Sequence, residues 1–191
     1  MTRARDLPGV PPSAVERLDV SRIMGTWYVV ATNYDFWAGR ANTTITYEPI
    51  DGPAGADPSL VKMSDVVAYT DGFGRGATPG AVVGVDLQDP TLAGHFQWRG
   101  DGLLHLIVSH WYVVALDPQY RWLVTYFADS NVGTGAGIDI YARQPCLPIE
   151  QEAAAIRAIF ADGWLAERAG GLFRVAHDEG AACLRARTLS E

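Results

Sequence analysis

Short apolar segments separated by turn residues dominate the chain up to about residue 143. Eight of them have the β-branched and aromatic composition of strands, at about 26–34, 43–49, 60–69, 81–87, 94–98, 103–116, 122–127 and 137–143. Clusters of Gly, Pro and Asp lie between them, for example Asp51-Gly52-Pro53 and Arg99-Gly100-Asp101-Gly102. Many short strands with regular turns are typical of an antiparallel sandwich or an up-and-down barrel. Eight strands in a closed barrel can enclose one small ligand.

The hydrophobic period changes after Pro148, where we expect an amphipathic helix over about 149–161, ended by Gly163. Its expected apolar stripe consists of Ala153, Ile156, Ile159 and Phe160. A short strand-like segment at 172–175 and a polar tail at 177–191 follow. The barrel and its helix would thus span 18–176.

The N-terminal extension at 1–17 contains Ser13-Ala14-Val15-Glu16, which fits a capping box and predicts a short helix. Its basic start has no apolar segment behind it, so we do not identify a secretory signal. On that ground we expect a cytoplasmic protein. No apolar segment is long enough for a membrane-spanning helix.

Three motifs stand at the ends of predicted strands. They are Gly25-Thr26-Trp27-Tyr28, Val114-Ala115-Leu116-Asp117-Pro118-Gln119-Tyr120 and Ile140-Tyr141-Ala142-Arg143-Gln144-Pro145. Together they resemble the three structurally conserved regions of the lipocalin family, over about 18–175. The middle motif departs from the usual Thr-Asp-Tyr form, because Pro118 follows Asp117 and the tyrosine is displaced to Tyr120.

The resemblance implies an all-β fold, an eight-stranded antiparallel up-and-down barrel with the C-terminal helix packed on its outside. It also implies a closed end, or floor, formed by Gly25, Trp27 and Arg143, with the arginine lying across the indole. Cation–π stacking would help to seal that end.

Composition narrows the functional classes. The 191 residues suffice for one domain with its own cavity, and the formal net charge of −7 argues against nucleic acid as a partner. Lys62 is the only lysine beside many Ala and Gly residues, which is typical of a high-GC bacterial genome. The two cysteines, Cys146 and Cys183, could pair, but free thiols are expected in a reducing cytosol.

Strand alternation assigns side chains to the barrel interior. Asp65 lies on the apolar face of its segment, so it points either into the barrel or to a solvated rim. In the last strand, alternation alone buries Ile138 and Ile140 and turns Asp139 and Tyr141 outward. The lipocalin resemblance implies instead that Arg143, on the same face as Asp139 and Tyr141, turns inward. If Ile138 and Ile140 pack under the helix, both readings agree and Asp139 and Tyr141 point into the lumen. An interior carboxylate needs a partner or a proton.

The same parity predicts a pocket rich in aromatic side chains. Its expected ligand-binding residues are Asn33, Tyr47, Val67, Tyr69, Phe96, Trp98, Ser109, Trp111, Trp122 and Tyr126. Trp98, Trp111 and Trp122 could equally be core residues. The oligomeric state is not determined by any of these patterns.

Catalytic and metal-site motifs are not found, and we expect neither a metal nor a cofactor. His105 and His110 lie an odd interval apart on one predicted strand, so they face opposite sides, and His95 has one partner at best. His105 would be the only histidine in the lumen.

Two functions fit this lumen. The first is a carrier that binds a small hydrophobic molecule, such as a lipid, a pigment or a polyketide-like compound. The second is a cofactor-free enzyme of natural-product biosynthesis, a cyclase of the [4+2] type or an isomerase, which would act by orienting a polyene. Its candidate catalytic residues are Asp139, Tyr141, Asp65 and His105.

Overall fold

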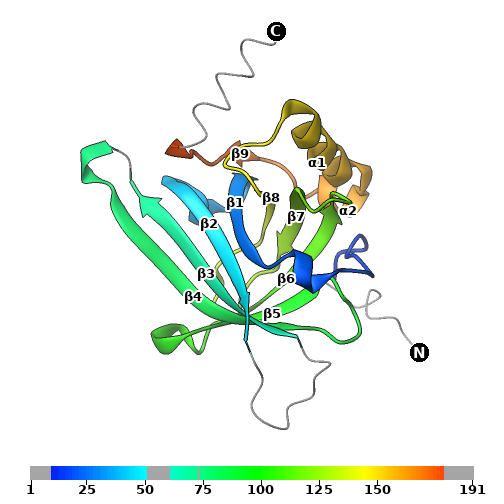
Figure 1. Ribbon diagram of the computed structural model, residues 1–191, viewed down its shortest axis with the longest axis horizontal. Coiled ribbons are helices and arrows are strands. Elements are labelled where there is room, and N and C mark those ends of the chain that lie inside the picture. Colours follow the sequence, from blue (N-terminus) through cyan, green and yellow to red (C-terminus); the bar gives the residue numbers. More distant parts are fainter. Residues whose placement is uncertain (1–9, 51–60, 73, 179–191) are drawn as a thin grey trace.

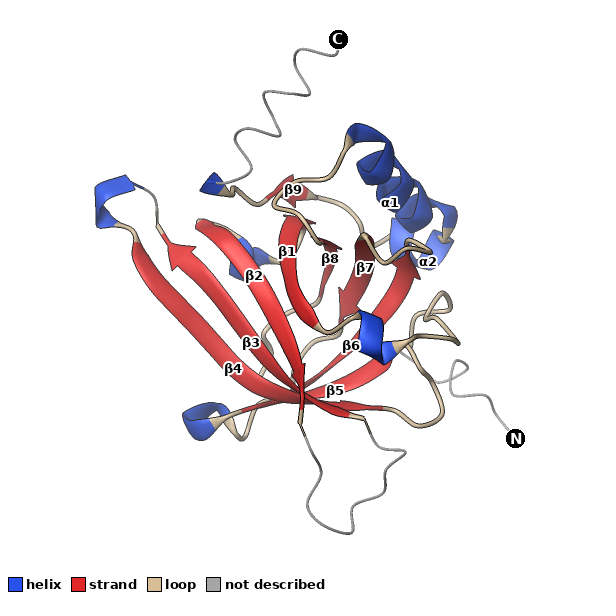
Figure 2. Cartoon of the chain, in the orientation of Figure 1, coloured by secondary structure: helices blue, strands red, loops and turns tan. Residues whose placement is uncertain are grey.

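The computed structural model describes residues 10–50, 61–72 and 74–178, and eight long strands dominate it (Figures 1 and 2). The strands are β1 (Gly25–Thr32), β2 (Arg40–Pro49), β3 (Lys62–Asp71), β4 (Thr78–Gln88), β5 (His95–Gly100), β6 (Val108–Leu116), β7 (Trp122–Phe127) and β8 (Gly137–Ala142). A two-residue strand, β9 (Phe173–Arg174), pairs with β1. Seven of the eight predicted strands begin and end within a few residues of the observed ones. The remaining one, predicted at 103–116, begins only at Val108, because the 3-10 helix η5 (Gly102–Leu104) occupies its expected start.

Every neighbouring pair of long strands is antiparallel, and β1 pairs with both β2 and β8. The sheet therefore closes into an up-and-down barrel, which leaves no free edge among the long strands. This confirms the fold class predicted from the sequence. Side chains of alternate residues point into the lumen, where the pocket forms.

Residues 13–16 do not form the helix that the capping-box pattern predicts. Instead the Val15 N–H donates to the Val113 carbonyl, and the Val15 carbonyl accepts from the Gly94 N–H. Backbone pairing with the β4–β5 connection and β6 satisfies the groups that a helix would have satisfied internally. A single turn, the 3-10 helix η2 (Val20–Arg22), follows before β1.

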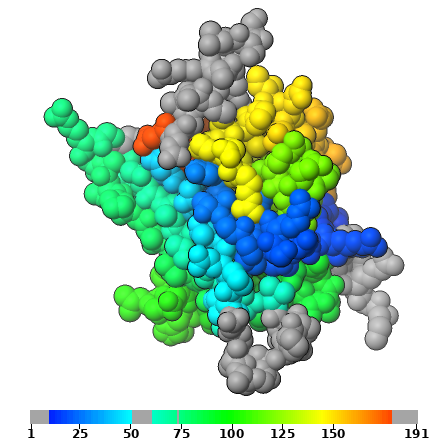
Figure 3. Space-filling view, viewed as in Figure 1, coloured from blue at the N-terminus to red at the C-terminus, as the bar shows by residue number. Residues whose placement is uncertain are grey.

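The helix α1 (Ile149–Ala161) occupies the predicted range and packs with α2 (Gly163–Ala166) on one side of the barrel (Figure 3). Its buried residues, Ala155 and Ile159, belong to one hydrophobic cluster with Ile138 and Ile140 of β8. The expected stripe is partly wrong, because Ile156 and Phe160 are exposed. The helix is rotated so that Ala154, Ala155 and Ala158 face the barrel together with Ile159.

The closed end of the barrel is built from Trp27 and Arg143. The Arg143 guanidinium carbon lies 3.6 Å from the centre of the Trp27 ring, and its nitrogens donate to the carbonyls of Arg22, Met24 and Thr26 at 2.6–2.9 Å. The Trp27 indole N–H donates to the Ile23 carbonyl at 2.7 Å. The structure thus contains the stacking that the family resemblance implies.

Gly25 makes this arrangement possible at the start of β1. Its φ of +85° lies in the left-handed region, and an added Cβ would stand 3.6 Å from the Arg143 guanidinium. A residue with a side chain would therefore strain the backbone just where the chain turns under the barrel.

Cys146, just after β8, is disulfide-bonded, which corrects the expectation of a free thiol at this position. Cys183 lies outside the described residues. A disulfide is more typical of an oxidising compartment than of the cytosol.

Candidate ligand-binding site

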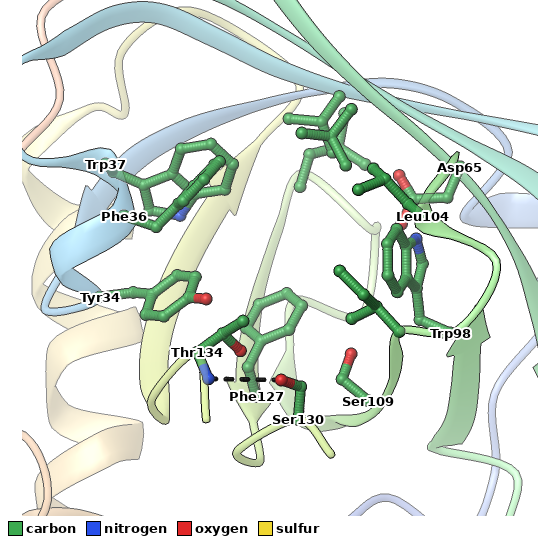
Figure 4. Close-up of a pocket in the computed structure, with 14 residues that line it drawn as sticks. Tyr34, Phe36, Trp37, Asp65, Trp98, Leu104, Ser109, Phe127, Ser130 and Thr134 are labelled. Carbon is green, nitrogen blue, oxygen red and sulfur yellow. Dashed lines mark hydrogen bonds between the residues drawn. The ribbon is translucent and has the colours of Figure 1, made fainter. Parts of the chain in front are cut away.

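A cavity of about 230 Å³ lies in the lumen, away from the closed end (Figure 4). Strands β2, β3, β4, β5, β6 and β7 contribute to its walls, and the connections β1–β2, β5–β6 and β7–β8 surround the end opposite the closed end. Its lining residues are mainly apolar or aromatic: Tyr34, Phe36, Trp37, Ile45, Asp65, Val67, Val82, Trp98, Leu104, Ile107, Ser109, Phe127, Ser130 and Thr134.

The aromatic side of the cavity comes from the β1–β2 connection, which forms the 3-10 turn η3 (Asp35–Trp37). Phe36 and Trp37 pack edge to face, with ring centres 4.7 Å apart. The Arg40 guanidinium covers the outer part of this cluster, 4.0 Å from the Phe36 ring and 4.6 Å from that of Tyr69. Stacked arginine and aromatic rings hold the connection against the barrel.

Trp98 forms the opposite wall, and Gly84 on the neighbouring strand makes room for it. A Cβ at Gly84 would lie 2.3 Å from the Trp98 indole nitrogen. Any larger residue at position 84 would push the indole toward the cavity. Figure 4 shows Trp98 and Asp65 together on one side, facing Phe36 and Trp37 across the pocket.

Asp65 lies toward the inner end of the cavity and has the one carboxyl group among the described residues that line it. It is 5% exposed and belongs to β3, opposite Tyr47 of β2 and Gly84 of β4. Its inward orientation agrees with one of the two readings of the sequence and excludes the solvated rim. Its nearest ionisable neighbour, Asp86, is fully buried.

The carboxyl groups of Asp65 and Asp86 interact directly. Burial raises the pKa of Asp65, although its hydrogen bond with Asp86 counteracts this. Burial and the Asp65 charge together raise the pKa of Asp86 well above its usual range, against the effect of a 2.7 Å hydrogen bond from the Trp111 indole. Two adjacent carboxyls cannot both ionise cheaply away from water, so the pair holds at least one proton near neutral pH.

Asp139 on β8 is a third buried carboxyl, and hydrogen bonds reach both of its oxygens. The Thr32 hydroxyl donates to Oδ1 at 2.5 Å, and the Trp37 indole donates to Oδ2 at 3.1 Å. Burial raises its pKa to about 7, although these two hydrogen bonds lower it. Asp139 therefore positions Trp37, which lines the cavity, rather than lining it directly.

Tyr47 and Tyr141 are buried phenols between these carboxyls. Burial first, and then the neighbouring acids, raise the pKa of both phenols well above the usual range. Both phenols therefore stay protonated. The inner lumen thus combines three carboxyls with two neutral hydroxyls.

Most residues assigned to the pocket from the sequence do point inward. Val67, Trp98 and Ser109 line the cavity, while Tyr47, Phe96, Trp111 and Tyr141 lie in the buried cluster of the lumen. Tyr69 packs on the Phe36 and Trp37 rings at its edge. Their role in ligand binding stays a prediction.

The placement of Trp122 and Tyr126 in the lumen is wrong. Both belong to the cluster beneath α1 and α2, and the Tyr126 ring meets the Trp164 ring 4.9 Å away. Directly opposed residues of antiparallel strands share a face, and Tyr126 pairs with the outward-facing Ile138. Leu123, opposite Tyr141, occupies the inward position instead.

The prediction that Asn33 points into the lumen, which came from simple alternation, is also wrong. The register of β1 against β8 shifts between Val29 and Ala31, so the faces of the following residues exchange. Thr32 then points inward to Asp139, while the Asn33 amide donates to the carbonyls of Arg168 and Gly170. A bulge has no signature in the local hydrophobic pattern.

His105 is exposed at the end of η5 and outside the lumen, because the strand that was expected to contain it begins only at Val108. His95 has two polar partners rather than one: its Nδ1 contacts Asp89 and its Nε2 contacts His110, each at 2.9 Å. In the described part of the chain, no group of three acidic, histidine or cysteine side chains is arranged for a metal ion.

Sequence reasoning did not single out Thr32, Trp37 or Asp86. Asp86 shares a face with Val82 and Gly84, whereas the opposite face of the segment is fully apolar, with Val83, Val85 and Leu87. Alternation would therefore have placed Asp86 outside the barrel. Nor did alternation indicate Trp37, since it reaches the lumen from a connection rather than a strand.

Comparison with known proteins identifies the fold. Insecticyanin from the tobacco hornworm Manduca sexta superposes with a TM-score of 0.62 at 16% identity, over 88% of this chain and 85% of that one. Lobster apocrustacyanin A1 gives 0.56 at 14% identity, over 85% and 80%, and H1 crustacyanin from Homarus americanus gives 0.54 at 14%, over 86% and 82%. No family model and no curated protein matches the sequence. The chain has the lipocalin fold.

A membrane-spanning helix is not found among the described residues, since none of their helices is long and apolar enough.

Proposed function

We propose that this protein binds one small, largely apolar molecule inside its barrel. The observation that carries the proposal is the aromatic and aliphatic cavity in the lumen. Ligand sites are commonly concave, mainly apolar and supplied with a few polar groups, as this cavity is. Its volume of about 230 Å³ is below the ~300–1,000 Å³ of usual ligand pockets, which favours a compact ligand.

The likeness to insecticyanin and the crustacyanins supports this proposal at the level of the fold only. A closed eight-stranded barrel has room for side chains or for one small ligand. Here the inner end is filled by Trp27, Phe96 and Trp111, while space remains on the side of the β1–β2 and β5–β6 connections. We infer that the ligand enters from that side.

The test fills the cavity without changing the exposed surface. Val82 lines the cavity and Val83, the next residue of β4, is 40% exposed on the outside. We expect Val82→Trp to weaken binding of the neutral fluorophore 2-(2-naphthyl)ethanol at least tenfold, measured by fluorescence titration. The matched control, Val83→Trp, adds the same ring outside and should bind as the wild type does.

Equal affinity of the Val82→Trp variant and the wild type would contradict binding in the lumen. Thermal unfolding of both variants shows whether each has folded before affinities are compared.

The cofactor-free cyclase or isomerase stays a prediction, with Asp65, Asp139 and Tyr141 as the interior candidates for its polar groups. Incubating catalytic amounts of protein with an extract of the source cells separates the two functions. A carrier releases its ligand unchanged, whereas an isomerising enzyme produces a compound of equal mass and different chromatographic retention. Cytoplasmic location and bacterial origin also stay predictions, and the disulfide at Cys146 counts against the first.

A further inference from the structure

The inner lumen has a large excess of acidic groups over basic ones. Asp65, Asp86 and Asp139 are each at most 5% exposed. The ion pairs among the described residues involve other acids: Asp89, Asp117, Glu152 and Glu167. Arg40 contacts rings at the outer edge of the cavity, and Arg143 lies beyond Trp27 at the closed end. In the described part of the chain, the three carboxyls therefore have no cationic partner.

The three acids differ in how far the protein satisfies them. Asp139 accepts hydrogen bonds from Thr32 and Trp37, and Asp86 accepts one from Trp111. No N–H or O–H of the described residues donates to Asp65 in this way, apart from a proton shared with Asp86. A singly protonated Asp65–Asp86 pair keeps one negative charge, for which the Trp111 indole is the one donor. Asp65 is the member of the pair that lines the cavity.

Resting on the function proposed above, we propose that Asp65 is the anchor for a protonated nitrogen on the ligand, so that the ligand class is a compact apolar amine. The ammonium would lie at the inner end of the cavity against Asp65, and the apolar part would fill the space between Trp98, Phe36 and Trp37.

A cation suits this place better than a neutral or anionic group. A buried, incompletely paired carboxylate costs several kcal/mol, and a matching cation removes that cost. Tyr47, Tyr141, Asp86 and Asp139 also face the inner lumen, and all of them are acidic or neutral. The face of an indole such as that of Trp98 attracts ammonium groups as well. An anionic ligand would be repelled by the charge of the carboxyl pair.

Charge balance makes the proposal dependent on pH. Near and below neutral pH, part of the Asp65–Asp86 pair holds two protons. When an ammonium binds, one of these protons is released to solvent and the pair keeps the other, so one carboxylate charge faces one ammonium. Since burial raises the pKa of both carboxyls, binding near and below neutral pH is coupled to this proton release. We therefore expect the affinity for an amine to rise between pH 5.5 and 8, while the affinity for a neutral ligand changes little.

The experiment compares three probes of the same ring system: 2-(2-naphthyl)ethylamine, 2-(2-naphthyl)ethanol and 2-naphthylacetate. We expect the amine to bind wild-type protein at least tenfold more tightly than the alcohol, and the acetate to bind most weakly. In Asp65→Asn the preference for the amine over the alcohol should disappear. Asp71→Asn, an exposed acid on the same strand, is the matched control and should keep the preference.

Two results overturn the proposal. One is equal binding of amine and alcohol by the wild type, and the other is an unchanged preference for the amine in Asp65→Asn. Both leave binding in the lumen intact, because the alcohol still reports it and Val82→Trp still tests it. Absence of saturable binding for all three probes contradicts the proposed function as well. Loss of folding does not confuse these results, since Asp65→Asn removes a poorly solvated acid and should not lower the melting temperature.

Discussion

The closed end of the barrel and the inner end of its cavity each contain an at least partly buried ionisable side chain, but the two differ in how many partners the protein supplies. At the closed end, Arg143 donates to three backbone carbonyls and lies on the Trp27 ring. Partial burial lowers its pKa to about 10, so it remains a cation at neutral pH. At the inner end of the cavity, Asp65 has no comparable set of donors. The first site is complete within the chain, and the second is completed by a proton or a ligand.

This difference separates structural from binding residues better than burial alone. Trp27 and Asp65 are both almost inaccessible, and both face the lumen. A fully partnered polar group contributes to stability and specifies one packing, whereas an incompletely partnered one lowers stability unless something binds it. Substitutions at the two ends should therefore have opposite effects on stability and on affinity.

The largest expected effect is the loss of Trp27. Trp27→Ala removes a fully buried ring and exposes the Arg143 guanidinium, so the free energy of unfolding should fall by roughly 3–5 kcal/mol. Chemical denaturation measures it, with Trp98→Ala as the comparison, because the Trp98 ring faces the cavity and is only half-buried. If both variants lost the same stability, the closed end would not differ from the cavity wall.

Asp139→Ala is expected to cause the second-largest loss in the free energy of unfolding. It leaves the Thr32 hydroxyl and the Trp37 indole without their acceptor, at about 1–3 kcal/mol for each buried donor. Removing the buried carboxyl offsets part of this cost, so we expect a net loss of roughly 2–4 kcal/mol. Asp139→Asn keeps one acceptor oxygen and should lose less. Urea denaturation measures both. Equal stability of Asp139→Ala and the wild type would contradict the structural role of this acid.

The third effect is a dependence of stability on pH. Burial raises the pKa of Asp139 from 3.8 to about 7, so between these values the folded protein holds a proton that the unfolded chain has released. Its contribution is fully present below about pH 4 and is lost as pH rises through about 7. The slope is at most about 1.4 kcal/mol per pH unit for one group.

Comparing Asp139→Asn with the wild type isolates this contribution from other titrations. The difference in free energy of unfolding should shift in favour of the variant as pH rises from 5 to 8. Asp71→Asn, an exposed acid, should show no such trend. A constant difference between Asp139→Asn and the wild type would contradict the raised pKa.

The smallest effect is expected for an arginine on the surface. Arg174 pairs with Glu152 of α1 at 2.7 Å and is 59% exposed, so Arg174→Ala should cost only about 0.2–1 kcal/mol. Arg143→Ala removes the same side chain from the closed end and should cost clearly more. Thermal unfolding of the two variants compares them. Similar melting temperatures would show that the three carbonyl contacts of Arg143 add little.

Much of the barrel could be predicted because its signals are local. Strand composition and turn clusters located the eight strands, and the change of period located α1. The inward placement of Asp139 and Tyr141 was also correct, but it came from the lipocalin resemblance, which turned Arg143 inward and left Ile138 and Ile140 to pack beneath the helix. Alternation then failed at Asn33, where a bulge shifts the register, and at Trp122 and Tyr126, whose faces depend on pairing with β8.

The sequence by itself therefore determined the strands and the helix, because residue propensities and turn residues act within a few residues of themselves. The closed end joins Trp27 to the distant Arg143 and was predicted from the resemblance of the three motifs to the lipocalins. Only the tertiary structure decided the candidate site. The contact of Asp65 with Asp86, the reach of Trp37 to Asp139 and the room that Gly84 leaves for Trp98 all join separate elements. Such contacts depend on register, bulges and loop placement, which are set by packing across the whole barrel.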